Sequence, residues 1–186
     1  MHKTLTLILI GISVFLLPTG DMMANSNLPN PPKEKVHSNP PTSMYIGNPG
    51  VIPRYIYENV GGNYIDYMRY EPNFPQSPDH IEYMQSLKSS YNWNDSYGSF
   101  IRGFILAPET GQYVFNITGD DFCEFYLSPD DLPGSIPAND TTAHIPGWTG
   151  TTEHTKYPQQ TSDTINLVMG DYDYFEVYQK EGGGGD

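Results

Sequence analysis

Two adjacent carboxylates, Asp120 and Asp121, are the residues of this sequence whose chemistry can be named first. They stand at the start of an alternating run, residues 122–128, which is typical of a β-strand. Two like charges ~4 Å apart repel each other by roughly 1 kcal/mol in water, and by more in a partly dry pocket. Ca²⁺ removes this repulsion, because it accepts several carboxylate and carbonyl oxygens at about 2.3–2.6 Å. With an acidic or amide side chain from another loop, the pair would form an open calcium site.

A second interpretation of the pair needs no metal. Short acidic side chains commonly cap turns by accepting hydrogen bonds from nearby backbone N–H groups. Another acidic pair, Asp130-Asp131, is interpreted as a solvated turn. The chain shows no fitting nucleophile and base, no phosphate-cradling loop and no zinc motif, so we expect that the protein is not an enzyme.

Strands must hold the acidic pair in place, and the alternation of apolar residues indicates where they run. Side chains that alternate along a strand point to opposite faces of the sheet. Two strands, residues 112–117 and 122–128, are each expected to offer an apolar face to one core. These faces consist of Tyr113, Phe115 and Ile117 in the first strand, and of Cys123, Phe125 and Leu127 in the second. Cys123 is the single cysteine, so it forms no intrachain disulfide, and its place predicts a buried small apolar side chain.

Two hairpins and one helix complete the predicted framework. A strand over residues 99–106 and a turn over 108–111 lead into the strand at 112, which predicts the first hairpin. A second hairpin is expected over residues 164–178, with its turn at Met169-Gly170-Asp171. A short helix on the rim of the sheets is expected over residues 80–87, where Ile81, Met84 and Leu87 recur at every third position.

The composition supports an all-β fold and excludes one class of partner. Among 186 residues there are 18 Gly, 17 Pro and 15 Tyr, which suit short strands and tight turns. The net charge is −13, with only 9 Lys and Arg, whereas a phosphate-binding surface needs clustered basic residues. We therefore expect no nucleic-acid partner, and cations or neutral ligands instead. Alternatively, the acidity only keeps a secreted protein soluble.

The chain divides into three parts. Residues 1–24 are expected to be a signal peptide cleaved after Gly20 or Ala24, because Lys3 precedes an apolar run that Pro18 ends. This run is shorter than the roughly 20 residues that cross a bilayer, so we expect no membrane span and a secreted, extracellular protein. Residues 25–50 are Pro- and Asn-rich and are predicted to be flexible. Residues 51–186 form the folded domain.

Three sequons agree with secretion. Asn94, Asn116 and Asn139 each begin an Asn-x-Ser/Thr triplet and are candidate N-glycosylation sites. Alternation directs Asn116 away from the core, which would leave its sequon usable. Residues 135–162 are polar and turn-rich and carry Trp148, which is typical either of a ligand-facing loop or of a further irregular strand pair.

Ordered blocks run through the chain from residue 51 to residue 186. They are residues 74–75 and 78–79, 91–98 with 101–104, 107–115, Gly119-Asp120-Asp121, 124–128, 174–177 and 180–186. Together they resemble the PA14 domain, an extracellular β-sandwich module known from anthrax protective antigen, yeast adhesins and glycosidases. The resemblance implies an antiparallel β-sandwich. In that family a last strand follows the glycine-rich loop, so this strand is expected to be missing here.

The resemblance also implies a ligand set. In sugar-binding members, a cis peptide joins the two aspartates and directs both at calcium, and the ion holds sugar hydroxyls. Their third ligand comes from the late loop, which nominates Asp186 here, with Glu181 as a weaker candidate. Trp148 is a weak candidate for stacking on a sugar face.

The predicted function is therefore a secreted, non-catalytic module for carbohydrate binding and adhesion, which uses a Ca²⁺ site at Asp120 and Asp121 and has glycans as partners. The alternative is an acidic structural component of an extracellular or biomineral (skeletal or shell) organic matrix, with matrix components as partners. The net charge of −13 motivates this alternative, because surface carboxylates could form a diffuse calcium-binding face.

Overall fold

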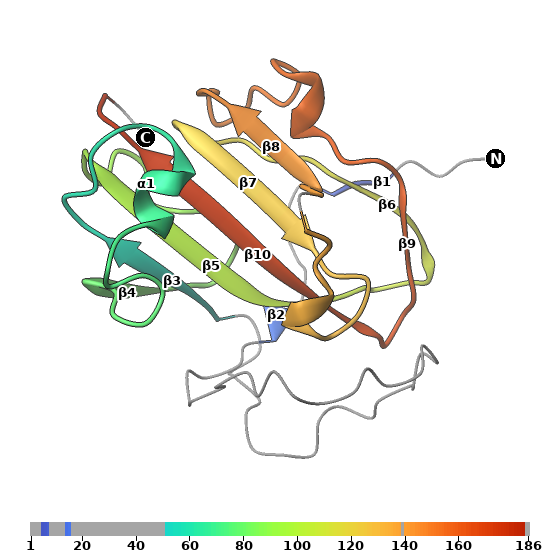
Figure 1. The fold of residues 1–186 in the computed structure, drawn as a ribbon. Coiled ribbons are helices and arrows are strands. Elements are labelled where there is room, and N and C mark those ends of the chain that lie inside the picture. The colour runs from blue at the N-terminus through green and yellow to red at the C-terminus, as the bar shows by residue number, and fades with distance from the viewer. Residues whose placement is uncertain (1–4, 8–13, 16–50, 139, 185–186) are drawn as a thin grey trace.

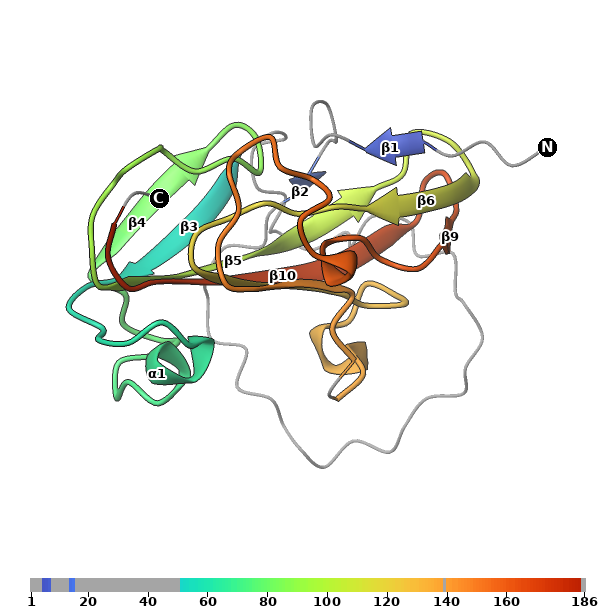
Figure 2. The ribbon, with the colours of Figure 1, turned by 90° about the horizontal axis from the view of Figure 1, so that it is seen from above.

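Two β-sheets stacked face to face form the protein, as the sequence predicted (Figures 1 and 2). The structure is a computed structural model, which describes residues 5–7, 14–15, 51–138 and 140–184. The larger sheet has the strand order β4-β3-β5-β10-β7-β8, with β2 beside β5, and the smaller has the order β1-β6-β9. All pairs of neighbouring strands are antiparallel except β1 and β6. The strands are β1 (Leu5–Leu7), β2 (Val14–Phe15), β3 (Ile52–Tyr57), β4 (His80–Met84), β5 (Tyr97–Leu106), β6 (Gly111–Phe115), β7 (Phe122–Leu127), β8 (Ala143–Pro146), β9 (Ile165–Leu167) and β10 (Tyr172–Glu181).

The main core lies between the two sheets. The alternation predicted for β6 and β7 is confirmed, because all six side chains named for their apolar faces are at most 9% exposed, Cys123 among them. They meet Ile101 and Ile105 of β5 and Phe175 of β10 in one apolar cluster. Burying one large apolar side chain contributes about 1.5–3 kcal/mol, so this cluster holds the long strands β5, β7 and β10 in register.

The outer face of the large sheet is covered at one end by a helix, α1 (Ile65–Arg69) (Figure 2). Ile65 and Met68 of α1 are buried against Tyr57 and Phe100, which point away from the main core. Met68 packs closely on the backbone of β5, because a Cβ at Gly98 would lie 2.5 Å from the Met68 sulfur. Short 3₁₀ turns at η1 (Pro133–Ser135) and η2 (Pro158–Gln160) shape the connections around β8.

The helix predicted over residues 80–87 is wrong, because residues 80–84 form strand β4. β4 pairs with β3 in a register that sets Glu82 opposite Arg54. As an edge strand, β4 leaves Ile81 and Tyr83 exposed, so the core does not require strict alternation along it. The three-residue spacing of its apolar residues therefore reflects no helix. The helix of the described chain lies earlier, at α1, where it is too short for periodicity to identify.

Both predicted hairpins are wrong in their pairing, although their strands exist. β5 lies in the large sheet and β6 in the small one, and β9 and β10 are divided in the same way. The reason is that the apolar faces of β5 and β6 both belong to the main core, so the strands face each other across it. Each turn thus carries the chain from one sheet to the other.

The N-terminal strands β1 and β2 pair with β6 and β5. Both belong to the predicted signal peptide, residues 1–24, whose other residues lie outside the described part of the chain together with residues 25–50. The three-part division of the chain stays a prediction. Among the residues that the structure describes, no helix is long and apolar enough to cross a membrane.

Candidate functional site

The acidic pair lies where the start of β7 meets the end of β10. These strands are antiparallel neighbours, and Phe122 of β7 is opposite Lys180 of β10. This register brings Asp120 and Asp121, which precede β7, next to Glu181 at the end of β10. One carboxylate oxygen from each of the three residues lies within 4.8 Å of the others. We call these three residues the acidic group.

The backbone around the acidic group is held by hydrogen bonds between distant segments. The peptide bond between Asp120 and Asp121 is cis, as the resemblance implied. The Gln179 side-chain amide donates to the carbonyl oxygen of Asp120 at 2.6 Å, and the Asp121 N–H donates to the carbonyl oxygen of Lys180 at 3.2 Å. The approach of the two aspartates is therefore set by β10 as well as by their own loop.

Asp121 also accepts two hydrogen bonds through its Oδ2 atom. Asn63 Nδ2 donates to it at 2.9 Å, and the N–H of Gly182 at 3.1 Å. Both donors come from segments about 60 residues away in the chain, so Asp121 joins three segments. The Gly182 N–H that donates to Asp121 comes from a distant segment, so this contact is not the local turn capping of the second interpretation.

Gly182 cannot carry a side chain in this arrangement. A Cβ there would lie 2.5 Å from Asn63 Oδ1 and 3.0 Å from Asp121 Oδ2. The carbonyl oxygen of Gly182 accepts hydrogen bonds from the backbone N–H and the hydroxyl of Ser96. Gly184 donates to Asp95 at 3.1 Å, so the glycine-rich end of the chain is tied to the turn before β5.

The acidic group has one buried and two partly exposed members. Glu181 is 1% exposed, whereas Asp120 and Asp121 are partly open to solvent. Burial raises the pKa of the Cys123 thiol, and the carboxylates of all three acidic residues raise it further. Burial lowers the pKa of Lys180 to about 8, although Glu181 and Asp121 act against this shift. The site is therefore an acidic corner at the edge of the core.

The donor set fits a hard divalent cation. Ca²⁺ takes oxygen ligands at about 2.3–2.6 Å, so oxygens on opposite sides of one ion are up to roughly 5 Å apart. The 4.8 Å limit of the acidic group agrees with that span. A cation would offset the repulsion among three carboxylates, and the partly exposed aspartates leave room for further ligands.

The structure changes the predicted ligand set. Glu181, the weaker candidate, lies with Asp120 and Asp121, whereas Asp186 lies outside the described residues and stays a prediction. Asn63 was missed by the sequence analysis. No local signal marks it, since its role arises where the segment before α1 meets the start of β7.

Two aromatic side chains, Trp148 and Tyr64, lie on segments that contact residues 119–121. Trp148 is 54% exposed and precedes Thr149, whose N–H donates to the carbonyl oxygen of Gly119 at 2.8 Å. The Lys156 ammonium lies 3.1 Å from the centre of the Trp148 ring, so one face of the ring carries a cation. Tyr64 follows Asn63, is 59% exposed and packs against Phe122 at 4.7 Å. Trp148 remains a predicted stacking residue, and Tyr64 joins it as a candidate.

The sequons differ in their surroundings. Asn94 is exposed and belongs to the turn that binds the glycine-rich end. The Asn116 amide donates to His154 O at 2.9 Å and to Thr161 Oγ1 at 2.6 Å, so its nitrogen is already bonded within the protein. Asn139 lies outside the described residues. All three remain predicted glycosylation sites, and of the two that the structure describes Asn94 is the more exposed.

Asp130 organises a turn of its own. It accepts hydrogen bonds from the Leu132 N–H and from the hydroxyls of Ser128 and Ser135. The interpretation of a solvated turn is therefore incomplete, since the side chain of Asp130 is a structural acceptor.

Comparisons with known proteins add a relative to this geometry. No family model matches the chain. A mouse (Mus musculus) protein, N-acetyl-beta-glucosaminyl-glycoprotein 4-beta-N-acetylgalactosaminyltransferase 1, is 28% identical over 152 residues, which are 81% of this chain and 14% of the mouse protein. The crystal structure of a beta-glucosidase from Kluyveromyces marxianus in complex with glucose matches with a TM-score of 0.40 and 13% identity, over 72% of this chain and 14% of that one. The chain thus spans a small part of the length of either protein.

The mouse relative corrects one prediction. The sequence predicted that the protein is not an enzyme, because it lacks a familiar catalytic motif. The mouse relative contradicts this prediction, since 81% of the chain aligns with part of a transferase. A search of this chain for catalytic motifs could not reveal the relationship, because the match covers 14% of the transferase.

Proposed function

We propose that this chain is a PA14-type domain that binds carbohydrate through a Ca²⁺ ion held by Asp120, Asp121 and Glu181. We further propose that it is exported and that it serves an enzyme acting on the glycans of glycoproteins. The observation that carries the proposal is the convergence of three carboxylates from β10 and the loop before β7. The name of the mouse relative supports the choice of glycans as partners.

The residues of this chain have separate tasks in the proposed site. Asp120, Asp121 and Glu181 would hold the ion, which supplies open coordination positions for sugar hydroxyls when bound. Asn63 donates a hydrogen bond to Asp121 Oδ2 and so orients that carboxylate. Gln179 holds the Asp120 backbone by donating a hydrogen bond to its carbonyl oxygen. These contacts would keep the two aspartates pointing toward one ion.

The exposed rings would supply an apolar surface for the sugar. Aromatic faces suit the C–H side of a pyranose, while the polar groups of the site take its hydroxyls. Lys156 lies over the Trp148 ring and Phe122 packs against the Tyr64 ring, so each ring would offer its remaining surface. Tyr64 directly follows Asn63, which contacts Asp121, and is therefore the stronger candidate for the stacking ring. We expect Tyr64→Ala to weaken glycan binding more than Trp148→Ala does, while calcium binding stays unchanged in both variants.

A glycan-binding assay with and without a chelator tests this proposal. The secreted chain is applied to an array of glycoprotein glycans that end in N-acetylglucosamine, N-acetylgalactosamine or other sugars, in the presence of Ca²⁺ or of EDTA. We expect binding that EDTA abolishes and that Asp121→Asn abolishes in Ca²⁺. Glu109→Gln is a matched control, because it removes one exposed negative charge from the turn after β5, whose other end is the one that pairs with Glu181.

Two results would contradict the proposal: no glycan is bound in Ca²⁺, or binding is equal in Ca²⁺ and EDTA. The alternative role in an extracellular or biomineral matrix rests on the net charge of −13 alone. It would gain support if Ca²⁺ bound weakly and equally well to wild type and Asp121→Asn, because a diffuse surface does not depend on one carboxylate.

A further inference from the structure

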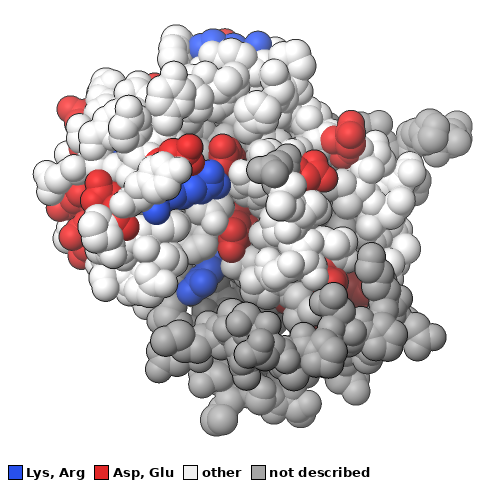
Figure 3. Space-filling model, in the orientation of Figure 1, with Lys and Arg blue, Asp and Glu red and all other residues white. Residues whose placement is uncertain are grey.

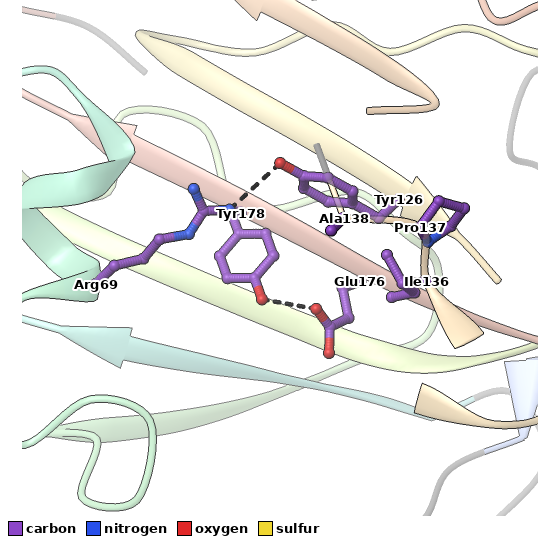
Figure 4. A pocket seen from close by; sticks show the side chains of 7 residues that line it. All are labelled: Arg69, Tyr126, Ile136, Pro137, Ala138, Glu176 and Tyr178. Atoms are coloured by element: carbon purple, nitrogen blue, oxygen red, sulfur yellow. Dashed lines mark hydrogen bonds between the residues drawn. The ribbon is translucent and has the colours of Figure 1, made fainter. Parts of the chain in front are cut away.

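A pocket lies on the outer face of the large sheet, away from the acidic group. It has a volume of about 210 Å³ and is open to solvent. Seven side chains line it: Arg69, Tyr126, Ile136, Pro137, Ala138, Glu176 and Tyr178 (Figure 4). Tyr126 and Glu176 are each five residues along their strands from Asp121 and Glu181, which corresponds to roughly 16 Å at the rise of a β-strand.

The floor of the pocket is built from the same short motif on two neighbouring strands. β7 carries Glu124-Phe125-Tyr126, and β10 carries Glu176-Val177-Tyr178. The antiparallel register places Tyr126 opposite Glu176, and Tyr178 opposite Glu124. Two tyrosines and two glutamates therefore alternate around one point on the sheet.

Each tyrosine hydroxyl donates to the glutamate of its own strand. The Tyr126 hydroxyl lies 2.8 Å from Glu124 Oε2, and the Tyr178 hydroxyl lies 2.6 Å from Glu176 Oε2. The two rings meet edge to face, with their centres 5.8 Å apart and their planes at 89°. The Tyr174 hydroxyl donates to the other oxygen of Glu176 at 2.8 Å. The rings and carboxylates are thus held in fixed orientations before any ligand arrives.

Arg69 of α1 occupies one half of this arrangement. Its guanidinium lies 4.4 Å from the centre of the Tyr178 ring and forms an ion pair with Glu124 at 2.8 Å. Burial alone would lower the pKa of Arg69, but the hydrogen bond with Tyr126 and the charge of Glu124 raise it above its usual value. Arg69 therefore remains charged and neutralises Glu124. The half with Glu176 stays open toward Ile136, Pro137 and Ala138.

The charges of the pocket select an uncharged ligand. Arg69 pairs with Glu124, and Arg102 of β5 lies opposite Glu176 in the register of β5 and β10. The charges around the pocket therefore balance, so it favours neither anions nor cations. A ligand cation would meet a tyrosine pair that Arg69 already uses. Figure 3 shows basic and acidic atoms side by side in the middle of this face, so no single sign dominates it.

The remaining groups match the chemistry of a sugar ring. Glu176 can accept hydrogen bonds from hydroxyl groups, the Arg69 guanidinium can donate to ring or hydroxyl oxygens, and Tyr126 with Ile136 and Pro137 offers apolar surface. Pockets for drug-sized ligands have volumes of about 300–1,000 Å³, so this smaller pocket suits one ring rather than an oligosaccharide chain.

We propose that this pocket is a second saccharide subsite, which holds one uncharged pyranose residue without a metal ion. The proposal does not rest on the acidic group, because none of its lining residues belongs to that group. Two subsites on one domain would raise the avidity for branched or clustered glycans, since the second contact becomes intramolecular.

Nuclear magnetic resonance titration of the full chain in EDTA tests the proposal. The probes are the methyl glycosides of N-acetylglucosamine, N-acetylgalactosamine, glucose and mannose, with methyl sialoside as an anionic probe and choline as a cationic one. We expect at least one neutral glycoside to shift the signals of Tyr126, Tyr178 and Ala138, and to do so more strongly than either charged probe. Because EDTA removes calcium, failure of the calcium site leaves this result unaffected.

Two variants separate this pocket from the rest of the surface. Ala138→Trp fills the pocket from an exposed position, and we expect it to abolish the shifts while the spectrum of the folded protein is retained. Glu176→Gln keeps an acceptor oxygen for one of the Tyr174 and Tyr178 hydroxyls but removes the charge and the second acceptor, and should weaken binding at least about tenfold. Glu109→Gln should leave binding unchanged.

The proposal is overturned if no neutral glycoside shifts these signals. It is also overturned if choline or methyl sialoside binds more tightly than every neutral glycoside, or if Ala138→Trp and Glu176→Gln both leave the shifts as they are. Should Ala138→Trp fail to fold, Glu176→Gln and the order of the probes decide the outcome.

Discussion

Single residues around the acidic group show how closely its side chains and backbone pack. Asp121 accepts hydrogen bonds from Asn63 and from Gly182. Asn63 and Asp121 lie so close to Gly182 that they leave no room for a Cβ there. The adjacent aspartates and the glycine-rich end are recognisable sequence patterns, whereas no pattern around Asn63 marks that residue. The sequence could therefore locate the pair but not the residues that hold it.

Gly182→Ala tests this fit at the residue scale. The new Cβ would have to move the Asn63 side chain, and such overpacking costs typically about 1–3 kcal/mol. We expect a loss of this size in the free energy of unfolding, measured by urea denaturation in EDTA, together with weaker calcium binding. Gly61→Ala is the control, since a Cβ there meets nothing within 4 Å. If the two variants are equally stable and bind calcium equally well, the close approach at Gly182 has no consequence.

Asn63→Ala tests whether Asn63 positions the Asp121 carboxylate for calcium binding. Removal of a residue that orients a metal ligand typically lowers metal affinity about 10- to 100-fold. We expect a loss in that range, measured by calcium titration, while the protein stays folded because Asn63 lies at the surface. An unchanged calcium affinity would show that Asn63 does not support Asp121.

At the scale of elements, β10 connects the two sites. Its outer face carries Glu176 and Tyr178 of the pocket, and its end carries Glu181 of the acidic group. Its inner face carries Gln179, which accepts a hydrogen bond from buried Arg54 at 3.3 Å and donates one to Asp120. Arg54 also donates to Glu82 of β4 and to the Tyr97 hydroxyl of β5, so one polar cluster ties the strands behind the acidic group together.

Arg54→Met tests the importance of this cluster. Removing one partner of a buried ion pair commonly costs about 3–5 kcal/mol, and the partial exposure of Glu82 reduces the expected loss to roughly 2–4 kcal/mol. Urea denaturation measures this loss, and Arg102→Met on the outer face is the matched control, for which we expect a smaller effect. Equal stability of the two variants would contradict a structural role for the cluster.

The elements that alternation could predict are those that line the core. β6 and β7 follow their apolar pattern because each has one buried face. β4 does not, because it is an edge strand in which Ile81 and Tyr83 are exposed. Its conformation is set by its hydrogen bonds with β3 rather than by a buried face. The pairing of β5 and β6 was missed for a similar reason: a four-residue connection fits a hairpin and a crossing between sheets equally well, and only the shared core decides.

At the scale of the whole molecule, buried titratable groups determine the alkaline stability. Burial raises the pKa values of Tyr57, Tyr174 and Tyr178 above the ordinary tyrosine value of about 10, so the stability they contribute is complete below pH ~10 and is lost above it. Lys180 acts oppositely: its folded pKa is about 8, so the unfolded chain binds more protons between that pH and the ordinary lysine value, and stability rises with pH there.

We therefore expect the melting temperature in EDTA to rise slightly from about pH 8 toward pH ~10 and then to fall steeply. Tyr174→Phe should reduce the alkaline fall, and Lys180→Met should remove the rise. Thermal unfolding monitored by circular dichroism at constant ionic strength measures both effects. A melting temperature that does not change across this window would contradict the burial of these groups.

Calcium binding to the acidic group is the central claim, and isothermal titration of the full chain with Ca²⁺ measures it most directly. We predict saturable binding of one ion in the wild type and in Glu109→Gln, and loss of that binding in Asp120→Asn/Asp121→Asn and in Glu181→Gln. The absence of saturable binding in the wild type would contradict the assignment of the site. So would saturable binding that persists in both Asp120→Asn/Asp121→Asn and Glu181→Gln.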